Sequence, residues 1–94
     1  MCYPGNMTTD KPIERSQTGV RIATPLLKVL KGLAEYKDIS LGDLLEGIVL
    51  HAFEGKQAFS EETLAVIGKL CEVYDCRLTA ADAHRLAESA EPDG

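Results

Sequence analysis

Three side chains in the C-terminal third of the sequence are of types that bind metal ions: Cys71, Cys76 and His84. Thiolate and imidazole groups are common ligands of structural zinc, which usually takes four of them at defined spacings. Here four residues separate the two cysteines, and neither a closer cysteine pair nor an obvious fourth ligand accompanies them. Cys71 also falls on the apolar face of a helical pattern, where a free cysteine behaves as a small hydrophobic residue. We therefore expect no metal site and no cofactor.

The sequence lacks the compact motifs that carry catalysis. Gly42 and Gly47 have the spacing of two glycines in a phosphate-binding loop, but the lysine and the serine or threonine of that loop are missing. No nucleophile motif and no pair of catalytic carboxylates is apparent. His51 and His84 lie beside apolar residues in helical patterns, and we interpret both as structural. The sequence predicts a protein that is not an enzyme.

Composition indicates one small globular domain. The chain has 94 residues, of which 45% are hydrophobic, enough for a packed core. So small a domain buries a modest fraction of its surface and is often stabilised by oligomerisation. The cysteine count is three, which favours reduced thiols over a disulfide framework. No apolar run is long enough to cross a bilayer, and the polar N-terminus does not read as a secretory signal, so we expect a cytoplasmic protein.

Charge is distributed unevenly along the chain, whose total is −5. Residues 11–37 contain six basic and two acidic side chains, a net +4, whereas residues 58–94 contain three basic and eight acidic ones, a net −5. Such asymmetry is typical of a basic nucleic-acid surface on an otherwise acidic protein, although scatter in a short sequence produces it too.

Residues 15–22 alternate in the manner of a half-buried strand, with a period of two. One side of the predicted strand carries Thr18, Val20 and Ile22, and the other carries Gln17, Gly19 and Arg21. A single strand leaves its backbone N–H and C=O groups unpaired, so a strand here requires a partner.

Two helices are predicted after this strand. Thr24 followed by Pro25 is a helix start, and apolar residues then recur at helical spacing to residue 37. Ser40 caps a second helix, which Gly55 ends. The apolar face of this second helix is wider than one short helix can cover. Gly47 in its middle indicates either a close helix approach or simple tolerance.

Two more helices are predicted in the C-terminal part. Ser60 caps the first, and Thr79 with Asp82 three residues later begins a shorter second one that ends before Pro92. At the other end of the chain, residues 1–12 show no periodicity and several turn-forming residues, so we expect a disordered N-terminal arm there.

The order of strand, helix, tight turn and helix over about residues 14–55 resembles the ribbon-helix-helix (MetJ/Arc/CopG-type) family of DNA-binding proteins. The resemblance rests on the strand alternation, on Thr24-Pro25 and on the spacing of Leu27, Leu30, Leu33, Ala34, Ile39, Ser40, Leu44, Leu45, Ile48 and Val49. It implies a mainly α fold in which the short N-terminal strand pairs across an intertwined homodimer. Residues 13–56 would form this domain, preceded by the disordered arm 1–12 and followed by an acidic helical extension, 57–94, with two C-terminal helices.

The resemblance also assigns roles to individual residues. In the family the outward-facing strand residues enter the major groove of DNA, and arginine and glutamine suit guanine and adenine respectively. The implied base contacts are Gln17, Gly19 and Arg21. The implied phosphate contacts are Arg15, Ser40, Leu41 and Gly42, the last three at a helix N-terminus. The implied dimer core is Thr18, Val20, Ile22, Leu44, Leu45, Ile48 and Val49.

These expectations together predict a homodimeric DNA-binding protein that regulates transcription through a two-stranded ribbon. Two alternatives stay open. An antitoxin-like protein would bind a protein partner through its C-terminal helices, residues 60–90. A scaffold would use the dimer for assembly alone, which the missing side chain at Gly19 and the acidic Asp43 and Glu46 near the phosphate site favour.

Overall fold

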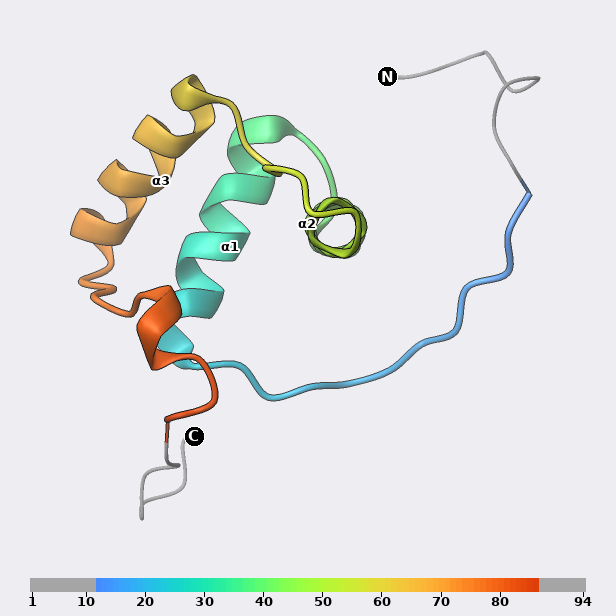
Figure 1. Cartoon of the computed structure of the whole chain (residues 1–94), viewed down its shortest axis with the longest axis horizontal. Coiled ribbons are helices and arrows are strands. Elements are labelled where there is room, and N and C mark those ends of the chain that lie inside the picture. Colours follow the sequence, from blue (N-terminus) through green and yellow to red (C-terminus); the bar gives the residue numbers. More distant parts are fainter. Residues whose placement is uncertain (1–11, 87–94) are drawn as a thin grey trace.

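The structure is a computed structural model and describes residues 12–86. Its elements are α1 (Thr24–Lys37), α2 (Leu41–Phe53), α3 (Glu61–Val73) and η2 (Ala80–Asp82), a single turn of 3-10 helix. In Figure 1, α1 and α3 lie side by side, and α2 is seen end-on, so it crosses the direction of the other two. α1 is the central helix, because it contacts both α2 and α3. α3 therefore packs on the predicted domain, although it belongs to the predicted extension.

The predicted strand is wrong for the chain as it stands. Residues 12–23 run as an extended coil from the N-terminal side of α1 (Figure 1), and no strand occurs within residues 12–86. We call residues 12–23 the extended segment. A half-buried strand forms only where one segment pairs with its backbone and another covers one of its faces. No described segment does so, and Val20 is 72% exposed. The ribbon-helix-helix architecture predicted from the sequence is accordingly not the architecture of this chain.

The prediction of two C-terminal helices is also wrong in the residues that the structure describes. α3 forms, but the second helix is reduced to η2. The Thr79 backbone N–H does donate to Asp82 Oδ2 at 2.9 Å, as expected of a helix start. After one turn, however, Ala83 is extended and His84 has φ 67°. A helix this short needs a buried face, and residues 80–86 are mostly exposed. The rest of the predicted helix, like the predicted arm at residues 1–11, lies outside the described residues.

The three α-helices begin nearly where the sequence places them. Ser40 Oγ accepts the Asp43 backbone N–H at 3.1 Å, and Ser60 Oγ accepts that of Thr63 at 3.2 Å, which confirms both predicted caps. α1 differs by one residue, because Ala23 is its N-cap and Thr24 is already helical. Its start thus has no side-chain cap and relies on the preset φ of Pro25.

All three helices end in the same way, with one residue in the left-handed conformation. These residues are Asp38 (φ 61°), Gly55 (φ 71°) and Asp75 (φ 55°). After each of them, the next backbone N–H returns to a carbonyl five residues earlier: Ile39 to Ala34, Lys56 to His51 and Cys76 to Cys71, at 3.0, 2.8 and 2.8 Å. This is the Schellman arrangement, which satisfies carbonyls that the helix leaves unpaired.

The core is small and lies where α1 meets the other helices. Leu33 is 1% exposed, and Ala34 and Leu44 are also buried. The residues packed around these three are Leu30, Ile39, Ile48, Phe59, Val66, Ile67 and Leu70. Gly32 allows the close approach of α1 and α3, because a Cβ at this position would lie 3.0 Å from Leu70 Cδ2. Nothing described lies within 4 Å of a Cβ at Gly47, which indicates tolerance and not a helix crossing within this chain.

Candidate functional site

Four of the seven predicted DNA-contacting residues line one wide cleft of about 1070 Å³ between the extended segment and the first turns of α2. Arg15 and Gln17 line it from the segment, and Ser40 and Gly42 line it from the start of α2. Ser40 and Gly42, which the resemblance assigned to phosphate contact, therefore lie across the cleft from Arg15 and Gln17. The predicted contacts Gly19, Arg21 and Leu41 do not line this cleft.

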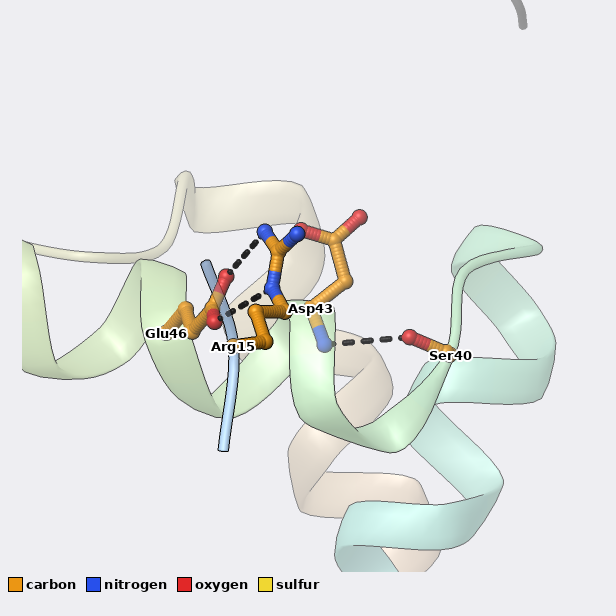
Figure 2. A network of polar contacts seen from close by, with 4 residues as sticks. All are labelled: Arg15, Ser40, Asp43 and Glu46. Carbon is orange, nitrogen blue, oxygen red and sulfur yellow. Dashed lines mark hydrogen bonds and ion pairs between the residues drawn. The ribbon is translucent and has the colours of Figure 1, made fainter. Parts of the chain in front are cut away.

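Arg15 and Glu46 form the strongest polar contact of the cleft (Figure 2). Arg15 Nε donates to Glu46 Oε2 and Nη2 donates to Oε1, each at 3.0 Å. The hydrogen bond and the opposite charge of Arg15 lower the pKa of the Glu46 carboxyl, and the same pair of effects raises the pKa of the guanidinium. Asp43 adds to the negative potential at Arg15. Both side chains remain largely exposed, so salt screens the pair.

The start of α2 uses one of its backbone N–H groups in a contact within the chain. Ser40 Oγ already accepts the Asp43 N–H (Figure 2), so this donor is satisfied within the chain. Leu41 is half-buried, whereas Gly42 is exposed and a Cβ there would meet open space. The positive end of the helix favours an anion at Gly42, but the Asp43 carboxylate beside it opposes one.

The three predicted base-contacting residues Gln17, Gly19 and Arg21 are all exposed. Gly19 presents backbone only, and nothing lies within 4 Å of where its Cβ would be. Arg21 takes part in an interaction within the chain. The segment thus carries one amide and two guanidinium groups, and both arginines take part in interactions within the chain.

The predicted dimer-core residues divide between two environments. Leu44 is buried inside the chain and Ile48 packs on the same core. Ile22 and Leu45 are half-buried, and Val49 is 44% exposed. Thr18 and Val20 are exposed on the extended segment.

A group of apolar side chains on α2 and on the extended segment lies outside the buried core. It consists of Leu45, Val49, Leu50 and Phe53 from α2 with Ile13 from the extended segment, and we call it the α2 outer face. Phe53 is 82% exposed and Ile13 70%. A groove of about 410 Å³ runs between Ile13 and the first three of the α2 residues. The width of the apolar pattern over residues 41–53 signals this face in the sequence; the contributions of Ile13 and Leu50 were missed, as was Glu46 as the partner of Arg15.

Within residues 12–86, no group of three or more histidine, cysteine, aspartate or glutamate side chains could hold a metal ion. No helix in this part of the chain has the length and apolarity needed to cross a membrane. Comparison with protein-family models, with curated proteins and with solved structures returned no significant match.

Proposed function

We propose that the protein is a homodimeric DNA-binding protein that acts on transcription in the cytoplasm. One observation carries the proposal: a solvent-exposed segment with cationic and amide side chains lies directly beside an uncovered apolar helix face. A second copy on the α2 outer face would bring two such segments together about a twofold axis. The resulting surface would combine phosphate-seeking and base-reading groups, and its spacing would impose symmetry on the DNA site.

Self-association is supported by the exposed apolar area. Large apolar patches on soluble chains mark interaction sites, and the α2 outer face joins residues from two separate elements. The chain is small, and its core rests on few fully buried side chains. A second copy covering Phe53, Leu50 and Val49 would enlarge the apolar interior of the pair.

DNA contact is supported by the charge and exposure of the N-terminal half. Residues 11–37 carry a net charge of +4, although the whole chain carries −5. The described cations in this range are all exposed: Arg15, Arg21, Lys28, Lys31 and Lys37. In this proposal Gln17 and Arg21 contact base edges and Arg15 contacts a phosphate. These contacts come from the extended segment as the structure has it, without a paired ribbon.

Selection from a randomised duplex pool tests the proposal. Wild-type protein is compared with a Gln17→Ala/Arg21→Ala variant, and both are checked as dimers by light scattering. A control variant, Gln57→Ala/Lys69→Ala, likewise removes one amide and one cation, here from exposed positions before and in α3. We expect wild type and control to enrich one symmetric motif and the segment variant to enrich none. A dimer that enriches no motif overturns DNA recognition.

A protein-binding scaffold is the second candidate, favoured by the acidic side of the cleft. Glu46 neutralises Arg15, and Asp43 lies beside it. In this candidate the dimer assembles other proteins through residues 60–90, where Val73 is 71% exposed. The antitoxin-like alternative, in which residues 60–90 of this chain fold only on binding a protein partner, is less favoured, because α3 is already packed on α1. An intact dimer with no salt-dependent affinity for DNA would support the scaffold.

A further inference from the structure

The turn that ends α3 places two cysteines against each other. The Asp75 N–H bonds to the Glu72 carbonyl at 3.3 Å, and the Cys76 N–H bonds to the Cys71 carbonyl at 2.8 Å. These two bonds, with Asp75 in the left-handed conformation, make up a Schellman motif. In this motif the side chains at the two ends of the outer bond commonly pack together. Cys71 and Cys76 occupy those two positions.

The two thiols differ in exposure. Cys76 is buried and Cys71 is half-buried, and both are free. A shallow opening of about 440 Å³ reaches both residues between Glu72, Asp75 and Arg77. Burial, the neighbouring Cys76 and a hydrogen bond between the two thiols raise the pKa of Cys71. The sulfur atoms therefore face each other at the edge of the fold, with Cys71 the more accessible.

We propose that Cys71 and Cys76 form a dithiol site that exchanges with small disulfides, such as glutathione disulfide, and closes to an intramolecular disulfide. A disulfide needs Cα atoms about 4.4–6.8 Å apart and side chains that point towards each other. The backbone bond between these two residues holds the chain close, and the contact between their thiols supplies the orientation. The inference is independent of DNA binding, because Cys71 lies in the last turn of α3 and Cys76 in the turn after it, and neither is among the residues proposed to contact DNA.

The exchange proceeds in two balanced steps. The Cys71 thiolate attacks one sulfur of glutathione disulfide, whose S–S bond breaks; one glutathione thiolate leaves and takes up a proton. The Cys76 thiolate then attacks the Cys71 sulfur and displaces the second glutathione. Two cysteine thiols thus lose two electrons and two protons, and one glutathione disulfide becomes two glutathione molecules. Because only the thiolate attacks, the raised pKa of Cys71 makes the first step slow at neutral pH and faster as the pH rises.

The experiment uses the full chain with Cys2→Ser, so that Cys71 and Cys76 are the only thiols. The protein is equilibrated in glutathione buffers of increasing oxidised fraction, alkylated and weighed intact. We expect a species that is lighter by two hydrogens and takes up no alkylating agent. Cys71→Ser and Cys76→Ser should each remove this species and leave at most one glutathione adduct. Accumulation of glutathione adducts in place of the light species overturns the proposal.

Two substitutions at Asp75 test whether the turn conformation favours formation of the disulfide. Asp75→Gly keeps the left-handed conformation, so its oxidation midpoint should match that of the Cys2→Ser protein. Asp75→Pro fixes φ near −65° and removes the N–H that bonds to Glu72, so its midpoint should move about tenfold or more towards oxidised glutathione. Circular dichroism confirms that both variants stay helical. If both share one midpoint, the turn does not assemble the site and the assignment fails.

Discussion

Arg15 and Glu46 join the extended segment to α2 through two parallel hydrogen bonds of 3.0 Å, in the forked geometry that a guanidinium also forms with phosphate. Glu46 therefore holds Arg15 in the manner expected of a DNA phosphate. Any phosphate that binds Arg15 must displace this carboxylate. The contact joins the segment to α2, and under the proposed function it would compete with DNA phosphate for Arg15.

Replacement of Glu46 should strengthen DNA binding and make the binding constant depend more steeply on salt concentration. In Glu46→Gln the guanidinium becomes available to phosphate, so the plot of log K against log salt should steepen by about 0.9, the value for one added phosphate contact. Fluorescence anisotropy with a fixed duplex at several salt concentrations measures this slope. Glu54→Gln, which removes a carboxylate paired with Lys56 at the other end of α2, is the control and should keep the wild-type slope. Equal slopes in both variants would contradict a competing role for Glu46.

Acid should release the extended segment from α2. The pKa of Glu46 lies below its ordinary value in the folded chain, because Arg15 stabilises the carboxylate. The pair therefore adds stability above the ordinary carboxyl pKa, and this contribution is lost as the pH falls through the lowered pKa. Carbon-13 NMR of the Glu46 carboxyl should show a low midpoint that returns to the ordinary value in Arg15→Gln. The same midpoint with and without Arg15 would show that the pair is absent in solution.

The α2 outer face should control self-association. Leu50→Ser/Phe53→Ser removes apolar side chains that contribute little to the fold of one chain, since they are 62% and 82% exposed. We expect light scattering to show a dimer for wild type and a monomer for this variant, with helix content unchanged. Val73→Ser alters an equally exposed apolar residue on α3 and should remain dimeric. A dimeric double variant would place the interface elsewhere.

Local signals in the sequence predicted α1, α2 and α3, but not that the fourth predicted helix is reduced to η2 in the described residues. Ser40 and Ser60 were identified as caps because a hydroxyl placed before an apolar period satisfies free N–H groups, whatever the tertiary structure is. Gly55 was identified as a helix end because glycine is favoured directly after a helix, and its φ of 71° in the structure agrees with this. The cleft was not predicted, although Arg15 and Ser40, which the resemblance assigned to phosphate contact, both line it.

The features that the sequence did not predict correctly depend on contacts between residues that are distant in the sequence. Alternation over residues 15–22 describes side chains, but a strand exists only where another backbone pairs with it, and the described chain supplies none. The ion pair of Arg15 with Glu46 joins residues 31 apart, and no local pattern signals it. The end of the first helix near Lys37 was predicted, but Asp75 ends α3 in a conformation that glycine favours, so no glycine in the sequence marked that helix end.

The mid-helix glycines should differ in how they tolerate alanine. At Gly47 and Gly68 a Cβ meets nothing within 4 Å, so alanine should stabilise the fold by about 1 kcal/mol through helix propensity. At Gly32 the same gain is opposed by the 3.0 Å approach to Leu70 Cδ2, so Gly32→Ala should gain less or lose stability. Urea unfolding at one protein concentration compares the three. Destabilisation by Gly47→Ala alone would show that a second copy covers this position.

The two serine caps should contribute unequally, because Ser60 supports a buried neighbour and Ser40 does not. Ser40→Ala should cost about 1 kcal/mol, the usual value for a lost cap. Ser60 Oγ accepts the Thr63 N–H and also bonds to Thr63 Oγ1 at 3.1 Å, and Thr63 is only 6% exposed. Ser60→Ala therefore leaves a buried hydroxyl without its partner as well as losing the cap, and should cost about 2 kcal/mol. Thermal and urea unfolding measure both, and Ser60→Thr, which restores a hydroxyl, should recover most of the loss. Equal costs for the two alanine variants would mean that solvent satisfies Thr63 and that the start of α3 is looser than the structure has it.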